Sequence, residues 1–293
     1  MLELVIVFVS VFGVPAFEDS SRLLGEMTDE GVLVLEGQRC LLPEPSLRGE
    51  LDSDSRQAVL DDLAGGRGWK HFSRASISAP VAIRVQYVKN AKGERIGHQV
   101  HCAFVVHAPL ETLKDRELME QLFLPTPSSE GDRNDADEQV SASAIGEEEL
   151  KAAGIASVAD DESYGLVELP LLKKVVVRGV MRSERQVDGN SVTLAWLIDP
   201  RFTGDPSGKN VWAKVNEDES GEMVLGETHP YRGAGGYMHI SRLAELPDAC
   251  LVEMRFVLHE PTDWFRGSAM LRSKLPLLLQ DSAKKFRRKV MNK

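Results

Sequence analysis

The stretch Gly236–His259, GYMHISRLAELPDACLVEMRFVLH, decides the fold of this chain. It holds two runs rich in large apolar residues, and between them lies Pro247-Asp248, a residue pair typical of turns. This pattern predicts two antiparallel strands, Gly236–Leu243 and Ala249–His259. We expect them to close an antiparallel meander.

The segment after these strands is predicted to be helical. In Leu271–Lys289, LRSKLPLLLQDSAKKFRRK, apolar residues recur at steps of three and four and give the helix one apolar face. The helical pattern extends from about Asp263 to Met291. Proline inside a helix removes a hydrogen bond and crowds the preceding turn, so Pro276 should kink this helix or split it in two.

More strands of the same meander are predicted before the closing pair. Leu171–Val187 and Ser191–Asp199 flank Asp188-Gly189-Asn190, a strong hairpin signal because such turns need residues that accept positive φ. Further strands are predicted at Val211–Asn216 and Met223–Glu227.

The first part of the chain predicts a hairpin. Pro80–Lys89 alternates between apolar and polar residues, and turn residues connect it to Ile96–Val106, whose Val100, Cys102, Phe104 and Val106 share one face. Gly31–Leu42 predicts another strand or a short hairpin arm, ended by prolines.

Helices and an acidic insertion fill the remaining sequence. A short helix begins near Ser53 or Asp54, either of which can cap it, and Gly65-Gly66 stops it. Glu111–Phe123 predicts a second helix. Residues 128–149 carry eight acidic side chains and one arginine, which predicts a mobile solvated insertion, closed by a short helix from Glu147 to Ile155.

The elements together predict an α+β fold, a curved antiparallel β-sheet wrapped around a long C-terminal helix. Their order resembles the helix-grip fold of the START and Bet v 1-like superfamily, also known as SRPBCC. Gly236–His259 is similar to the closing strands of that fold, Glu260–Phe265 (EPTDWF) to the proline-containing entry to the final helix, and Leu271–Lys289 to the helix itself. The resemblance spans roughly Pro80 to Val290 and is clearest over the last ~60 residues.

The resemblance implies a cavity between sheet and helix for an apolar ligand such as a lipid, a sterol or a polyketide. A strongly bent sheet cannot fill its own concave side, and such cavities are mostly apolar with a few placed polar groups. If it holds, Trp196 and Trp212 would line the cavity, Arg178 or Arg255 would anchor a head group, and His239 would reach it. The simpler interpretation is core packing for the tryptophans, solvent exposure for the arginines and an ordinary sheet position for the histidine.

The N-terminus predicts export. Leu4–Val14 is an apolar run of the length found in secretory signals, and cleavage after Ala16 fits the small residues at the cleavage site, although Glu3 largely cancels the positive α-amine. The alternative is a buried strand. We therefore expect a signal peptide at 1–16, an N-terminal extension with a short helix at 17–79, a helix-grip-like domain at 80–293, and a periplasmic or extracellular location.

Composition and motifs exclude several functions. The net charge of −10 disfavours nucleic-acid binding. The three cysteines, Cys40, Cys102 and Cys250, are widely spaced, so no zinc motif is present, and their disulfide status is open. His98, His101 and His107 lie on one strand, but His101 and His107 are about 20 Å apart at the ~3.3 Å rise of a strand, too far for a shared metal. Residues 204–210 only superficially resemble a phosphate loop. No cofactor motif, metal site or catalytic triad signature is found.

The C-terminus is basic. Six of the ten residues Lys284–Lys293 are lysine or arginine and none is acidic. Such charges stabilise the negative end of a helix dipole, and they also attract an anionic membrane surface by ~1 kcal/mol per side chain.

Three functions remain. The favoured hypothesis is non-catalytic binding or transport of an apolar or amphipathic small molecule. The second is an enzyme of the same fold that uses His239, Tyr231 or Glu253 as acid or base. The third is a structural or interaction protein of the cell envelope. A cavity beneath the final helix distinguishes the first from the third, and a buried titratable group in that cavity distinguishes the first from the second.

Overall fold

The computed structural model of the chain describes residues 22–49, 51–115, 119, 141–204, 208–217 and 223–291. The predicted signal segment at 1–16, residues 128–140 of the acidic insertion and most of the predicted helix after Asp115 lie outside the described residues. The predictions for those segments therefore remain predictions, as does the domain boundary between residues 79 and 80.

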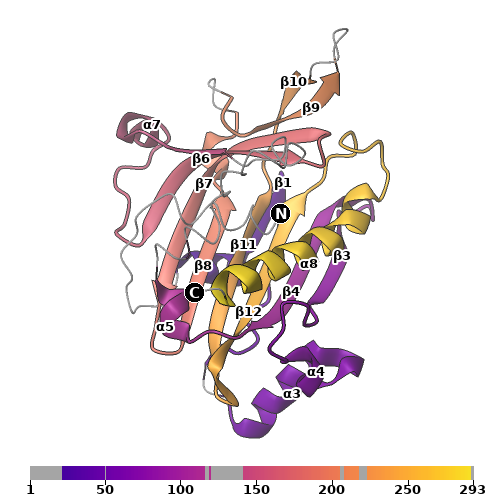
Figure 1. Cartoon of the computed structure of the whole chain (residues 1–293). Helices are drawn as coiled ribbons and strands as arrows, with labels where there is room; N and C mark the ends of the chain where they lie inside the picture. The colour runs from indigo at the N-terminus through magenta and orange to yellow at the C-terminus, as the bar shows by residue number, and fades with distance from the viewer. Residues whose placement is uncertain are drawn as a thin grey trace, which may run out of the picture.

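Ten strands form one antiparallel sheet in the order β10-β9-β7-β8-β11-β12-β4-β3, with β5 and β6 joined to it through β7 (Figure 1). The predicted curved antiparallel sheet with a long C-terminal helix is confirmed. The strands are β3 (Ala82–Lys89), β4 (Arg95–Val106), β5 (Ser141–Ala144), β6 (Glu162–Leu171), β7 (Val175–Val187), β8 (Ser191–Ile198), β9 (Val211–Glu217), β10 (Met223–Pro230), β11 (Ala234–Leu243) and β12 (Leu246–His259).

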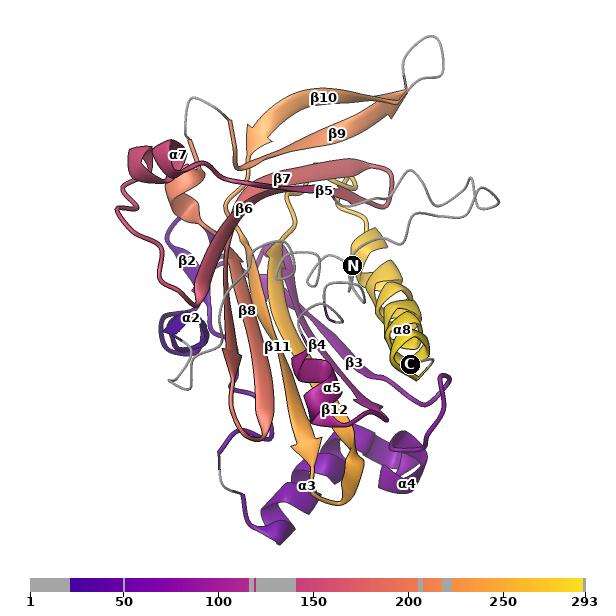
Figure 2. The ribbon, with the colours of Figure 1, turned by 60° about the vertical axis from the view of Figure 1, so that its left-hand side comes forward.

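The sheet divides at β7. One edge of β7 pairs with β6, while on the other edge its first residues pair with β9 and its later residues pair with β8. Buried Asn210 bridges this division, because its Oδ1 accepts a hydrogen bond from the Val180 N–H at 2.7 Å and its Nδ2 donates to the Asp199 carbonyl at 2.7 Å. Beyond the division, β5, β6 and β7 curl over the rest of the sheet, which gives the sheet a concave face (Figure 2).

One strand prediction in this region had the wrong start. The predicted strand Leu171–Val187 is β7, which begins only at Val175; Leu171 is the last residue of the preceding strand β6, and Leu172 and Lys173 take positive φ values of 53° and 52° and turn the chain between the two strands. Pro170 lies within β6. Because proline has no N–H to donate to a neighbouring strand, its presence argued against a strand there, and β6 was not predicted. The end of the predicted solvated insertion is also ordered, since β5 pairs with β6 and the helix α7 (Glu147–Ala152) follows it.

The helix α8 (Met270–Met291) lies across the concave face over β3 and β4 (Figure 1). Its buried side chains follow the predicted three-four spacing, and Phe286 meets Phe104 of β4 edge to face at 5.7 Å between ring centroids. The helix begins at Met270 and not at Asp263, and Pro276 does not split it. Leu275 and Leu279, on either side of the proline, are both fully buried and hold both turns on the sheet.

The convex face is covered by the N-terminal part of the chain. The α2 turn (Arg22–Gly25), the η1 turn (Glu26–Glu30) and the hairpin of β1 (Val32–Leu35) and β2 (Gln38–Cys40) bury Leu23, Leu24 and Met27 against Tyr237 and Val257. Further along the same face lie α3 (Ser53–Ala64), η2 (Gly65–Arg67) and α4 (Trp69–Phe72). The N-cap of α3 is Asp52, which accepts from the Ser55 N–H at 2.8 Å, and not Ser53 or Asp54 as predicted. The remaining elements are α5 (Leu110–Lys114) and η4 (Pro200–Phe202).

Candidate functional site

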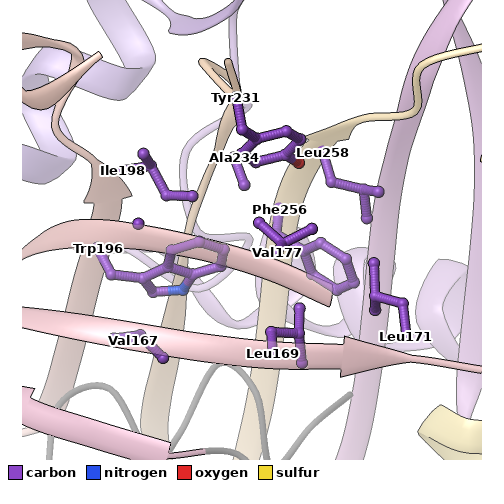
Figure 3. A pocket seen from close by; sticks show the side chains of 11 residues that line it. Val167, Leu169, Leu171, Val177, Trp196, Ile198, Tyr231, Ala234, Phe256 and Leu258 are labelled. Carbon is purple, nitrogen blue, oxygen red and sulfur yellow. The ribbon is translucent and has the colours of Figure 1, made fainter. Parts of the chain in front are cut away.

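An apolar cavity lies inside the curl of the sheet, where β6 and β7 face β8, β11 and β12 (Figure 3). None of the described residues that line it comes from α8, so this cavity is not the one predicted between the sheet and the C-terminal helix. Side chains alternate between the two faces of a strand, so one residue in two from each of these strands points into the cavity. Its walls are apolar and consist of Val167, Leu169 and Leu171 from β6, Val177 and Gly179 from β7, Trp196 and Ile198 from β8, Ala234 from β11, and Phe256 and Leu258 from β12, with Tyr231 at one end.

The cavity is small. Its volume is about 40 Å³, whereas sites that enclose a small molecule measure about 300–1,000 Å³. A lipid-sized ligand therefore requires the walls to move apart.

Tyr231 contributes a hydroxyl to an otherwise apolar lining. The hydroxyl donates to the backbone carbonyls of Gly233 at 3.0 Å or His259 at 3.1 Å, so its hydrogen-bonding capacity is directed to the backbone. Burial raises the pKa of Tyr231, which keeps the phenol neutral. The ring stacks on Trp264 at 5.6 Å between centroids, and Trp264 in turn meets Trp212 at 6.0 Å. These aromatic rings form a rigid end wall.

The sheet order, together with α8 on the concave face, is the helix-grip arrangement. The chain therefore has the helix-grip fold that its sequence predicts.

Comparison with solved structures finds human START domains. The lipid transfer and protein localization domain of human StarD13 matches at 12% identity and a TM-score of 0.38, covering 71% of this chain and 84% of that chain. Human StAR-related lipid transfer protein 5 matches at 11% identity and a TM-score of 0.39, covering 72% and 82%. Human STARD10 matches at 14% identity and a TM-score of 0.36, covering 83% and 86%. No protein-family model and no curated protein matches the chain.

The five predicted ligand-binding residues do not lie together in this fold. Trp196 lines the cavity, and Trp212 lies next to it in the aromatic end wall. Arg178 lies on the other face of β7, where its guanidinium donates to the Gly208 carbonyl at 3.0 Å. His239 and Arg255 point to the convex face. Their ligand-binding roles remain predictions.

Arg255 belongs to a buried polar cluster on the convex face. Its Nε donates to the carboxylate of Glu253 at 2.8 Å, and the same carboxylate accepts from the backbone N–H of Ser46 at 2.7 Å and lies 3.0 Å from His101 Nε2. Burial alone would raise the pKa of Glu253, but the hydrogen bond with His101, the charge of Arg255 and the Ser46 N–H lower it to about 2. The cluster joins the N-terminal segment to β12 through a charged carboxylate.

The three acid-base candidates of the enzyme hypothesis lie in three places. Tyr231 is in the cavity wall, Glu253 is in the convex-face cluster, and His239 lines a separate polar pocket at the end of β11. Among the described residues, no group of His, Cys, Asp or Glu has the geometry to hold a metal ion. Cys40, Cys102 and Cys250 are free thiols. No helix in the described ranges is long and apolar enough to cross a membrane.

Sequence reasoning missed most of the cavity wall. Leu169 and Leu171 come from β6, which was not predicted as a separate strand. Phe256 and Leu258 lie in a strand that was predicted, but the prediction did not say which face of the sheet their side chains occupy. Alternation along β12 would have placed Phe256 and Leu258 on one side and Glu253 and Arg255 on the other. Tyr231 was considered only as an acid or base.

Proposed function

We propose that this chain binds an apolar or amphipathic small molecule inside the curl of its sheet, without catalysis. The observation that carries the proposal is the cavity whose walls are apolar and whose Tyr231 hydroxyl faces backbone carbonyls. Such a lining offers a ligand no acid, base or charge. Burial of the ligand's apolar surface in it is favourable by about 25 cal/mol per Å².

The wall most free to move is the end of β6. Its Leu169–Leu171 segment pairs with β7 along one edge, while β5 pairs only with the preceding residues, Gly165–Glu168. Displacing Leu169 and Leu171 therefore breaks no ladder hydrogen bond to β5. The hydrocarbon part of an incoming ligand would then contact Phe256 and Leu258 in place of these leucines. The two residues would therefore keep apolar contacts.

A cavity-filling variant tests the proposal. Ala234 presents only a methyl group to the cavity (Figure 3), so Ala234→Leu should occupy the space that a ligand enters. The matched control is Ala152→Leu, which adds the same atoms to an exposed position of α7. Both variants are titrated with a series of fluorescent fatty acids of increasing chain length. We expect saturable binding to the unaltered protein and to Ala152→Leu, and at least tenfold weaker binding to Ala234→Leu. Equal binding to all three proteins would place the ligand elsewhere, and the absence of binding would favour the structural-protein alternative.

Delivery at a membrane is part of the proposal. Lys284 and Arg288 of α8 are exposed, whereas Arg287 is buried and does not reach a membrane surface. Co-sedimentation with anionic vesicles should exceed that with neutral vesicles and fall when Lys284 and Arg288 are changed to Gln. Equal sedimentation with both vesicle types would contradict the proposed delivery at an anionic membrane.

Export is also proposed, on the apolar Leu4–Val14 segment. N-terminal sequencing of the protein recovered from its own source should begin at Phe17. A sequence that begins at Met1 would contradict export by a cleaved signal.

A further inference from the structure

A second pocket lies on the convex face, away from the apolar cavity. It has a volume of about 690 Å³, within the about 300–1,000 Å³ of small-molecule sites. Its floor is the start of β8 and the end of β11, one wall is the turn between β7 and β8, and the other wall is the N-terminal segment around Arg48 together with α3. The pocket brings together parts of the chain that are far apart in sequence.

Three arginines from three different elements line this pocket. Arg48 comes from the segment before α3, Arg56 from α3 and Arg242 from β11. Each also forms an ion pair with a carboxylate outside the lining: Arg48 with Glu44 at 3.7 Å, Arg56 with Glu245 at 3.9 Å and Arg242 with Glu111 at 3.4 Å. At these distances the guanidinium groups of Arg48 and Arg56 make no hydrogen bond to a described residue, so their planar N–H groups can donate to an oxyanion.

Asp188 is the acidic residue in the lining, and its oxygens are engaged by its own turn. One carboxylate oxygen accepts the backbone N–H groups of Asn190 and Ser191, both at 2.6 Å, and the other accepts the Ser191 hydroxyl at 2.6 Å. These bonds lower the pKa of Asp188 against a rise caused by burial, so it stays charged, and the lining carries three positive charges and one negative charge.

Buried polar groups line the floor without a full set of partners. The hydroxyl of Ser241 is buried and has no hydrogen-bond partner in the described part of the chain, although the side chain lines the pocket. His239, which is 4% exposed, bonds to the Thr193 hydroxyl through Nδ1 at 2.9 Å and makes no hydrogen bond to a described residue through Nε2. Burial lowers the pKa of His239 to about 4, so at neutral pH it is a neutral hydrogen-bonding group. Leaving a buried polar group unpaired is unfavourable, and a ligand oxygen would satisfy it.

We propose that this pocket binds a small molecule that carries phosphate groups. The guanidinium groups of Arg48 and Arg56, which make no hydrogen bond to a described residue, match phosphate oxygens in two-pronged geometry, and a third arginine, Arg242 of β11, suits a second charged group. The hydroxyl of Ser241 and the imidazole of His239 then contact the oxygens that reach the floor. Such phosphate groups are carried both by a soluble phosphate ester and by the head group of a phosphoinositide.

Calorimetric titration at constant ionic strength tests this site. The probes are pyrophosphate and soluble inositol trisphosphate for the free ester, and vesicles with phosphatidylinositol bisphosphate for the head group. We expect saturable binding of at least one probe, weakened tenfold or more in both Arg48→Gln and Arg56→Gln. The matched control is Arg39→Gln on β2, an exposed arginine outside the pocket, which should bind as the unaltered protein does.

The thermal unfolding midpoint of each variant, measured without probe, shows whether it is folded. Ser241→Ala supplies a second readout, because it removes the floor hydroxyl and should weaken binding without removing a charge. The proposal is overturned if no probe binds saturably, or if folded Arg48→Gln and Arg56→Gln bind as tightly as Arg39→Gln. The Ala234→Leu cavity variant should bind these probes normally, so failure at one site is distinguishable from failure at the other.

Discussion

Arg287 gives the sharpest test of how α8 is fixed to the sheet. Its side chain is 1% exposed, and its guanidinium donates to the carbonyls of Val105 at 2.9 Å, Ala79 at 2.6 Å and Pro80 at 3.0 Å, with a longer bond to the Ile77 carbonyl at 3.4 Å. The group also lies over the Phe104 ring at 5.2 Å from the centroid. Burial lowers the pKa of Arg287 to about 10, so it is still charged at neutral pH. One side chain thus joins the last turns of α8 to the end of β4 and to the segment that leads into β3.

The magnitude follows from these bonds. Arg287→Met keeps an apolar stem of similar length and removes the Arg287 donors of all four carbonyls. A hydrogen bond to a charged group contributes about 1.5–3 kcal/mol, which sums to roughly 4–9 kcal/mol for the three shorter bonds. The variant no longer buries a charge, and that gain offsets part of the loss. We therefore expect a net loss of about 3–5 kcal/mol, because buried backbone carbonyls are left without a donor.

Urea unfolding followed by circular dichroism measures this loss. The matched control is Arg288→Met, because Arg288 is the next residue and is exposed; it should change stability by less than about 0.5 kcal/mol. Arg287→Lys should fall between the two, since an ammonium group cannot contact three carbonyls in the same fork geometry. A loss below about 1 kcal/mol for Arg287→Met, or one equal to that of Arg288→Met, would refute the reasoning.

Three further predictions concern packing and charge. Leu275→Ala should cost about 2–5 kcal/mol in urea unfolding because its side chain is fully buried, whereas Leu277→Ala, at a 54% exposed position of the same helix, should be nearly neutral; equal effects would mean that α8 does not pack as described. Glu253→Gln should cost stability above pH 4.5, its ordinary pKa, and this cost should shrink as the pH falls towards 2, the value in the fold; a cost independent of pH between 2 and 6 would contradict the charged cluster. Gly233→Ala should cost about 1–3 kcal/mol because a Cβ there would lie 2.2 Å from the Val34 carbonyl oxygen, while Gly189→Ala, with open space around it, should change the thermal unfolding midpoint little; a stable Gly233→Ala would show that β1 does not pack on this loop.

The sequence predicted the regular elements where one periodicity dominates. Gly236–Leu243 and Ala249–His259 are strands β11 and β12, and the three-four spacing of Leu271, Leu275 and Leu279 marks the face of α8 that is buried. These patterns are local, and the packing of the sheet against the helix only reinforces them.

Features that depend on long-range pairing could not be predicted. The division of the sheet at β7 depends on Asn210, whose amide joins strands distant in sequence. In the sequence Arg287 is one member of a basic cluster, because nothing in its neighbours shows that four backbone carbonyls surround its guanidinium. The pocket that His239 lines requires an N-terminal segment folded over β11, and no periodicity indicates that contact.

Native mass spectrometry tests the central claim, that an apolar ligand enters the curl of the sheet, most directly. The protein is purified from its own source without detergent, measured, and measured again after incubation with lipid vesicles and removal of the vesicles. The proposed function predicts an apolar adduct of one molecule per chain, identified by organic extraction, that is absent from Ala234→Leu and present in Ala152→Leu. A bare chain mass for the unaltered protein in both measurements would contradict it and leave a packed structural protein.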